Sequence, residues 1–167
     1  MMVAGSFGGW SQRLVPWLGV ALLIVTADQF SKIVIEKAFH LGDVRPVTSY
    51  FSLVLAHNRG AAFSMFDGGA GWQAHVLTGV GIGACLFIMY LLARHGAQRL
   101  FSSALALILG GALGNVVDRV LHGHVIDFLL FHYRQWEFPA FNVADSAINV
   151  GAALLILDEL LRVRRSG

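Results

Sequence analysis

The chain has 167 residues, of which 56% are hydrophobic and 13% charged, with a formal net charge of +2 and a pI of about 9.0. A soluble domain carries about a quarter of charged residues, so this composition argues against a soluble fold and indicates a membrane protein. The sequence has no basic stripe with interleaved aromatic residues, so nucleic acid is not an expected partner.

Four segments are expected to cross the bilayer as helices, because a span needs about 20 mostly apolar residues. The fourth is the weakest, since only Ala147–Leu157 within it is free of charge. No small-x-small cleavage site ends the first run, so we expect an uncleaved helix there. The chain is therefore predicted to be one domain, 1–167, with an all-α four-transmembrane-helix bundle. The predicted helices are about 14–35, 76–93, 100–117 and 141–161.

Small residues spaced four apart recur in these segments, a pattern that lets helix backbones approach closely in lipid. The lone Cys85 lies inside an apolar run and is interpreted as a core or lipid-facing residue. The small-residue pairs are Gly79 with Gly83, Gly110 with Gly114, and Ala147 with Gly151.

The placement of basic residues predicts the orientation. Arginines are densest in the short segments around Arg13, Arg94–Arg99 and Arg162–Arg165, which should therefore be cytoplasmic. We expect both termini inside, in a multi-pass protein of the bacterial cytoplasmic (inner) membrane. The loops at about 40–70 and 118–140 would then lie outside.

The first outer loop carries a strand signal. Tyr50–Val54 alternates in part, Asn58–Gly60 reads as a turn, and Asp67–Gly69 closes the segment. We therefore predict a small extracytoplasmic β-sheet cradle at the membrane surface, whose edge could pair with an extended peptide.

Two aspartates near the outer boundary are candidate catalytic residues. Asp127 lies in the apolar stretch 123–131, where desolvation should raise its pKa. Asp145 follows Asn142, a good N-cap, and its alternative role is that of a capping acid. If the two carboxylates lie close together they would share one proton, a state suited to peptide hydrolysis.

Other polar residues of the boundary have two open interpretations, support of a site or direct contact with substrate. Asp28 and Lys32 are four apart on one helix face and can pair. Asp118 and Arg119 end the third span, and Asn115 lies one turn earlier. Arg119 can pair with Asp118 or bind carbonyl groups of the helix end.

Competing chemistries fit less well. The serines lack a nucleophile motif, and Cys85 lies in mid-span. His122, His124 and His132 could form a metal site but lack the spacing of a helical zinc motif. A proton-coupled transporter is the alternative function, although the sequence shows no repeated halves.

Five blocks of residues, in order over nearly the whole chain, resemble the lipoprotein signal peptidases, also called signal peptidase II. They are Asp28-Gln29-x-x-Lys32, Asn58-x-Gly60-Ala61-Ala62-Phe63-Ser64, Gly110-Gly111-Ala112-x-Gly114-Asn115-x-x-Asp118-Arg119, His124-Val125-x-Asp127-Phe128 and Phe141-Asn142-x-Ala144-Asp145-Ser146.

The resemblance implies an aspartic endopeptidase with Asp127 and Asp145 as its dyad near the outer (periplasmic) face. Its substrates would be prolipoproteins cleaved before a diacylglyceryl cysteine, with membrane lipid around it. It implies no metal or organic cofactor, inhibition by globomycin and, as the simplest expectation, a monomer. The residues expected to bind substrate or support the site are Asp28, Lys32, Asn58, Gly60, Asn115, Asp118, Arg119 and Asn142.

Overall fold

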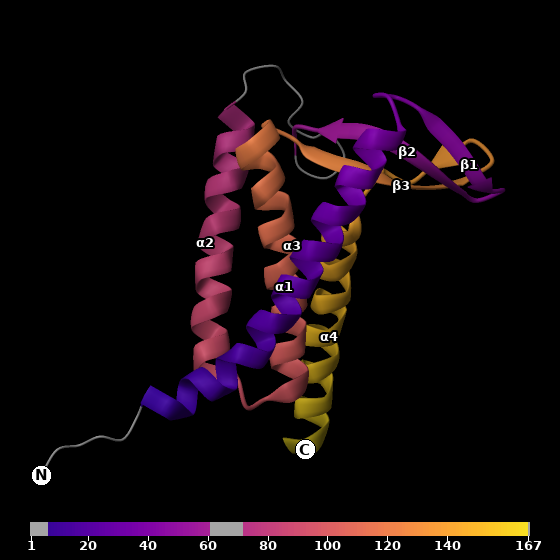
Figure 1. Ribbon diagram of the computed structural model, residues 1–167. Coiled ribbons are helices and arrows are strands. Elements are labelled where there is room, and N and C mark those ends of the chain that lie inside the picture. Colours follow the sequence, from indigo (N-terminus) through magenta and orange to yellow (C-terminus); the bar gives the residue numbers. More distant parts are fainter. Residues whose placement is uncertain (1–6, 61–71, 167) are drawn as a thin grey trace, which may run out of the picture.

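The computed structural model describes residues 7–60 and 72–166. In chain order these form α1 (Phe7–Ala38), β1 (Val44–Thr48), β2 (Phe51–Asn58), α2 (Trp72–His95), α3 (Arg99–His122), β3 (Val125–Tyr133), β4 (Trp136–Glu137) and α4 (Val143–Ser166). The helices form a bundle, and the sheet projects sideways from one end of it (Figure 1). The start of α1 and the end of α4 lie at the other end.

Within the described residues, three helices are long and apolar enough to cross a membrane: Leu14–Ala38, Ala74–His95 and Arg99–His122. This result confirms three of the four expected spans. Charged residues set α4 apart, because Asp145 stands in its first turn and further acidic and basic residues fill its last two turns. Its 24 residues nevertheless match α2 and α3 in length.

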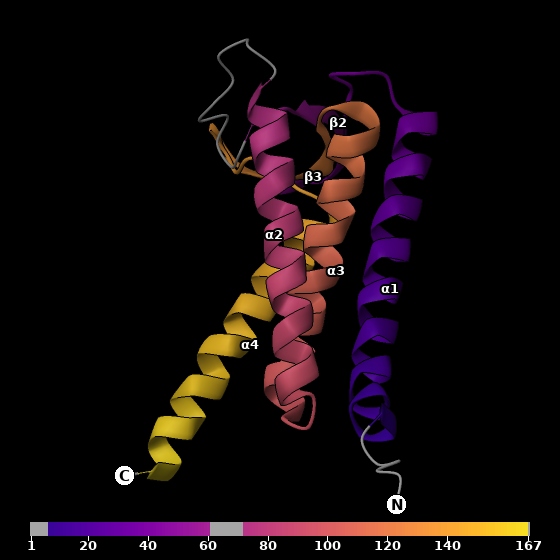
Figure 2. The same ribbon diagram turned by 90° about the vertical axis from the view of Figure 1, so that its left-hand side faces the viewer.

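Helix α3 is the centre of the bundle. Of its apolar window 56% is buried, against 22% for that of α1 and 17% for that of α2. The views in Figures 1 and 2 agree that α1, α2 and α4 surround it. The lipid-facing sides of the outer helices carry large exposed apolar side chains such as Leu23, Phe87 and Leu160.

Glycines allow the close contacts of α3 with its neighbours. A Cβ on Gly110 would lie 2.7 Å from the Ala21 carbonyl oxygen of α1, and one on Gly151 would lie 2.7 Å from the Ala104 carbonyl oxygen. The expected packing role is therefore confirmed for these positions. It is wrong for Gly79 and Gly83, because nothing lies within 4 Å of a Cβ built there.

Two apolar clusters hold the fold together. One joins α1, α2 and α3 through Ala21, Leu92 and Leu109 and includes Cys85, which is thus a core residue. The other packs the end of α1 against the sheet, through side chains such as Phe39 and Ile126. The sheet is therefore anchored on the bundle.

The sheet is antiparallel, in the order β1-β2-β3-β4. The segment 118–140, expected as an outer loop, contributes β3 and β4, and α3 continues to His122. The apolar run of β3 is the reason, because it pairs with β2 and buries Val125–Phe128. An irregularity between Leu53 and Ala56 of β2 lies beside the pair Ala56 and Asp127, and such bulges re-aim side chains.

The beginning of α4 is tied to β3. The carbonyl oxygen of Phe141 accepts hydrogen bonds from the N–H groups of Phe128 and Leu129 at 3.0 and 2.8 Å, and the Phe141 N–H donates to the Leu129 carbonyl at 3.0 Å. The first turn of α4 thus starts next to the strand that carries Asp127. The predicted turn at Asp67–Gly69 and the motif residues Ala61–Ser64 lie outside the described residues.

We expect Gly111→Ala to lower the free energy of unfolding by about 2 kcal/mol, because the added methyl would collide with the Ala144 carbonyl and lie 2.7 Å from Ile148 Cγ1. Gly83→Ala is the matched control, since its methyl would meet open space. Thermal unfolding of both variants in detergent measures the difference. Equal midpoints would contradict the packing described for α3 and α4.

Candidate active site

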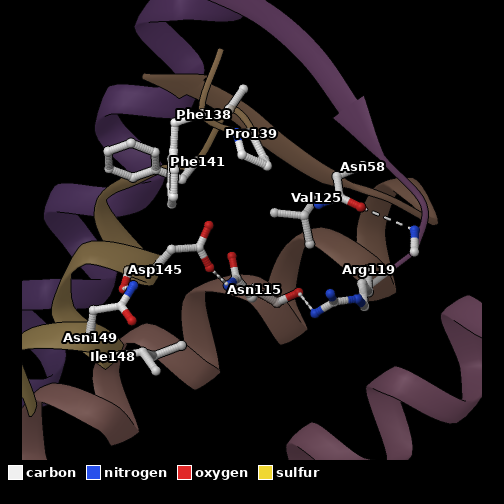
Figure 3. Close-up of a pocket in the computed structure, with 12 residues that line it drawn as sticks. Asn58, Asn115, Arg119, Val125, Phe138, Pro139, Phe141, Asp145, Ile148 and Asn149 are labelled. Atoms are coloured by element: carbon white, nitrogen blue, oxygen red, sulfur yellow. Dashed lines mark hydrogen bonds between the residues drawn. The ribbon is translucent and has the colours of Figure 1, made fainter. Parts of the chain in front are cut away.

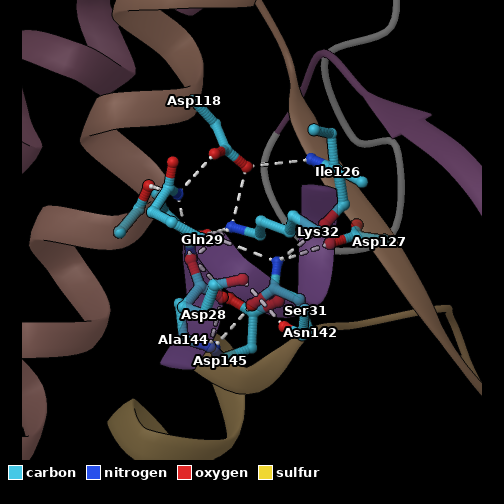
Figure 4. Close-up of polar contacts among 12 residues, drawn as sticks. Asp28, Gln29, Ser31, Lys32, Asp118, Ile126, Asp127, Asn142, Ala144 and Asp145 are labelled. Atoms are coloured by element: carbon cyan, nitrogen blue, oxygen red, sulfur yellow. Dashed lines mark hydrogen bonds and ion pairs between the residues drawn. The ribbon is translucent and has the colours of Figure 1, made fainter. Parts of the chain in front are cut away.

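A buried lysine lies where α1, α3 and α4 meet. The ammonium Nζ of Lys32 is 2.7 Å from Oδ2 of Asp28 and 2.7 Å from Oδ2 of Asp118, and it donates to Oδ1 of Asn115 at 3.3 Å (Figure 4). Lys32, Asp28 and Asp118 are each at most 1% exposed. All three donors of the ammonium therefore have acceptors, as a buried charge requires.

The two carboxylates of this ion cluster also bind backbone. Asp28 Oδ1 accepts a hydrogen bond from the Ala144 N–H at 2.9 Å, and Asp118 Oδ2 accepts one from the Ile126 N–H at 3.1 Å. Ala144 immediately precedes Asp145, and Ile126 immediately precedes Asp127. The ion cluster thus positions the backbone beside both candidate aspartates.

Gln29 is a contributor to which the sequence analysis assigned no role. Its Nε2 donates to Asp118 Oδ1 at 2.8 Å and lies 3.2 Å from Asp28 Oδ2 and 3.3 Å from the Gly114 carbonyl oxygen. Its role could have been predicted from its position inside an apolar span, because a polar side chain in lipid needs a hydrogen-bonding partner.

Asp127 lies on β3 and is 2% exposed. Its Oδ1 accepts from Asn142 Nδ2 at 2.7 Å, and its Oδ2 accepts from Asn58 Nδ2 at 3.0 Å. Burial raises the pKa of Asp127 to about 7, with a further contribution from the Asp145 carboxylate, while the two amide donors act in the opposite direction. The expected effect of desolvation is confirmed.

Asp145 stands in the first turn of α4. Asn142 caps the helix as predicted, because its Oδ1 accepts from the Asp145 N–H at 2.8 Å. The carboxylate of Asp145 is bound from α3, where Asn115 Nδ2 donates to its Oδ1 at 2.7 Å. Asn142 is therefore the residue that caps the helix, and the carboxylate of Asp145 is directed toward Asn115 of α3.

Two asparagines join the aspartates. Asn142 bonds to the Asp127 carboxylate and to Oδ1 of Asn115 at 3.3 Å, while Asn115 bonds to Asp145. The Asn115 oxygen also accepts from Lys32, which orients its amide so that the NH₂ group points at Asp145. The two acids thus belong to one hydrogen-bonded network, which also includes the buried ammonium of Lys32.

A cavity of about 300 Å³ opens beside this network (Figure 3). Asp145 and Asn58 line it, whereas Asp127, which is hydrogen-bonded to Asn58, does not. Its walls are partly apolar, which suits an extended peptide with apolar side chains. The other lining residues are Gly60, Asn115, Arg119, Val125, Phe138, Pro139, Ala140, Phe141, Ile148 and Asn149.

Arg119 is a half-buried cation in the cavity wall. It does not pair with Asp118, which binds Lys32 instead; its Nη1 donates to the Asn115 carbonyl at 3.4 Å. Its buried Nε has no partner among the described residues. At the rim, the Gly60 N–H donates to Asn58 Oδ1 at 3.1 Å, which closes the predicted turn.

The structure thus brings together every residue that the sequence analysis assigned to the site. It places His132 apart from the other two histidines: His132 bonds to Ser52 Oγ at 2.9 Å, while the ring of His124 stacks on that of His57 and lies 5.8 Å, centroid to centroid, from that of His122. Among residues 7–60 and 72–166, no group of three or more His, Cys, Asp or Glu side chains is arranged to hold a metal ion.

We expect Lys32→Met to lower the free energy of unfolding by about 3–5 kcal/mol, because two buried carboxylates would lose their counter-ion. Denaturant unfolding in detergent provides the measurement. Lys37→Met, on the exposed side of the same helix, is the matched control. Unfolding of both variants at the same denaturant concentration would show that the ion cluster does not stabilise the fold.

Known proteins resemble this chain over most of its length. The family described as Signal peptidase (SPase) II matches residues 20–161. A lipoprotein signal peptidase of Burkholderia vietnamiensis is 62% identical over 92% of this chain and 93% of its own length. One of Ralstonia nicotianae is 57% identical over 97% of this chain and 94% of its own length.

Solved structures of bacterial membrane enzymes share the fold. One superposes with a TM-score of 0.82 at 27% identity and covers 92% of this chain and 93% of the other. A second has a TM-score of 0.77 at 28% identity, with 96% and 98% covered. The family match and these relatives favour the peptidase interpretation over the transporter, and the chain belongs to the signal peptidase II family of membrane peptidases.

Proposed function

We propose that the chain removes the signal peptide from prolipoproteins by cutting before a cysteine that carries diacylglycerol, with Asp127 and Asp145 as the catalytic pair. The observation that carries the proposal is the joining of these two buried acids by Asn142 and Asn115 beside a partly apolar cavity. The names of the relatives support the substrate class.

The proposed chemistry divides the work between the two acids. With a pKa of about 7, Asp127 carries the shared proton in a large share of molecules at neutral pH and in more at lower pH. Once the substrate has displaced the Asn58 amide from its carboxyl group, Asp127 donates a hydrogen bond to the scissile carbonyl. Asp145, which lines the cavity, takes a proton from the attacking water. The proton on Asp127 passes to the carbonyl oxygen and yields a gem-diol.

Collapse of the gem-diol completes the reaction. Asp145 gives its proton to the leaving amine nitrogen as the C–N bond breaks, and Asp127 recovers a proton from one hydroxyl group. The products are a new carboxyl end on the signal peptide and the free amine of the lipidated cysteine. The pair returns to its starting protonation state.

The cavity wall would hold the peptide. The Nε of Arg119, which has no partner among the described residues, and the amide of Asn58 can bind backbone carbonyl groups of the substrate. Phe138, Phe141 and Ile148 offer apolar surface for side chains or lipid. Asp28, Lys32 and Asp118 do not line the cavity and would act indirectly, by positioning the two aspartates.

We further propose that α4 is the fourth span and that both termini are cytoplasmic in the inner membrane, with a monomer as the working unit. The distribution of charge supports the orientation. Arg94, Arg99 and Arg162–Arg165 lie at the end of the bundle away from the sheet, where the positive-inside rule requires them (Figure 1). The cavity then lies near the outer face, where a lipid-anchored cysteine can reach it.

Asp127→Asn and Asp145→Asn should each reduce cleavage of a diacylated lipobox peptide by at least about 1,000-fold, because an amide can neither share the proton nor activate water. Purified variants in detergent provide the assay. Asp43→Asn, a change at a partly exposed aspartate outside this network, is the control and should retain activity. Globomycin should inhibit the wild type, and full processing by either dyad variant would rule the proposal out.

The pH profile tests which acid holds the proton. Wild-type kcat/KM should fall as pH rises through about 7, where Asp127 loses its proton. Asn58→Leu removes a donor that stabilises the ionised form, so the pKa of Asp127 should rise and the alkaline limb should move to higher pH.

Asn149→Leu is the matched control for this shift. Asn149 lines the same cavity, but its amide donates to the backbone oxygen of Asp145 at 3.0 Å rather than to a carboxylate. A limb that moves to lower pH in Asn58→Leu, or moves equally in both variants, would contradict the assignment of the proton to Asp127.

A further inference from the structure

A second cavity, of about 430 Å³, lies at the end of the bundle away from the sheet. Helix α4 diverges from α2 and α3 toward its C-terminal end (Figure 2), and the cavity lies between the start of α3 and the last turns of α4. Gln98, Arg99 and Leu100 line it from α3, and Asp158, Leu161, Arg162 and Arg165 line it from α4.

Positive charge dominates this cavity. Three arginines line it, against one acidic residue, Asp158. Arg162 also binds Glu159, at 2.8 and 2.9 Å, whereas Arg99 and Arg165 have no ion pair with another described residue. Like charges around one cavity repel each other, and a bound anion would relieve that repulsion.

The start of α3 adds to the positive potential. The N-cap residue Gln98 makes no side-chain capping bond, and the first turn contains no acidic residue. Arg99 instead stands at the positive end of the helix dipole, where a cation is unfavourable by itself. The cavity therefore combines guanidinium groups with the backbone N–H groups of the first turn of α3, which have no acceptor within the helix. Together these two kinds of donor can recognise a phosphate group.

The surroundings are those of a lipid rather than of a soluble anion. Leu100 and Leu161 form the apolar part of the lining, and the candidate membrane span of α3 begins at Arg99. On α4 the neighbouring Leu157 and Leu160 are 44% and 63% exposed. An amphiphile with its phosphate on the arginines would lay its acyl chains along these side chains.

We propose that this cavity binds the phosphodiester headgroup of an anionic phospholipid in the leaflet at this end of the bundle, which is the cytoplasmic leaflet in the proposed orientation. Basic pockets between membrane helices on that side are suited to such headgroups. The site is separate from the aspartate network and does not depend on the proposed peptidase chemistry.

Native mass spectrometry of the full chain in detergent, titrated with phosphatidylglycerol or phosphatidylcholine of the same acyl chains, tests the proposal. We expect one phosphatidylglycerol to bind, and the double variant R99Q/R165Q to bind it about 30-fold more weakly, as two lost arginine contacts imply. The single variant R165Q, changed only in the exposed last turns of α4, should show part of this loss.

The matched control is R94Q/R164Q, which removes two charges from the same end of the bundle but none from the cavity. It should retain selective binding. Equal losses in both double variants would show general charge attraction and overturn the proposal. Displacement of the lipid by inorganic phosphate or glycerol 1-phosphate would assign the site to a soluble anion and overturn the lipid assignment.

Discussion

A lysine ammonium without access to water must be neutralised, and Lys32 is neutralised by Asp28 from its own helix and Asp118 from α3. These two carboxylates also accept hydrogen bonds from the backbone N–H groups of Ala144 and Ile126, the residues that precede Asp145 and Asp127. One cation therefore sets the separation of α1, α3 and α4 at the level where the proposed chemistry takes place. The three helices can move little at this level, because a shift of any one of them would leave a buried charge without its ionic partner.

The same cluster organises the amides between the acids. Lys32 occupies the oxygen of Asn115, which leaves the NH₂ group to face Asp145, and Asn142 spans from the helix cap to Asp127. Each amide has its donors and acceptors assigned by its neighbours, so the two aspartates are held in position before substrate binds. Such preorganisation favours a transition state whose charge develops at fixed points.

Several parts of this site follow from local sequence rules. Spacing along one helix predicts the pair of Asp28 and Lys32, and the N-cap role of Asn142 follows from its place before a helix. The apolar neighbours of Asp127 predict its desolvation. These features were predictable because each depends on residues a few positions apart.

Other parts depend on contacts between distant segments and were missed. Asp118 binds Lys32 rather than its neighbour Arg119, which requires knowing how α1 packs on α3. The apolar segment that begins at Val125 was expected to be part of an outer loop. It forms strand β3 because β2 supplies a hydrogen-bonding partner from a distant part of the chain. Likewise, Gly79 and Gly83 fit a packing pattern, yet Gly81 faces the Val116 side chain of α3.

We propose that the two aspartates, joined through Asn142 and Asn115, share one proton, which Asp127 holds at pH values up to about 7. Infrared titration of the ligand-free protein, following the carbonyl stretch of protonated carboxyl groups, tests it most directly. The expected result is a buried carboxyl signal that titrates with a pKa of about 7 and is missing in Asp127→Asn. A signal that persists unchanged in Asp127→Asn, or two fully ionised carboxylates at pH values well below 7, would contradict it.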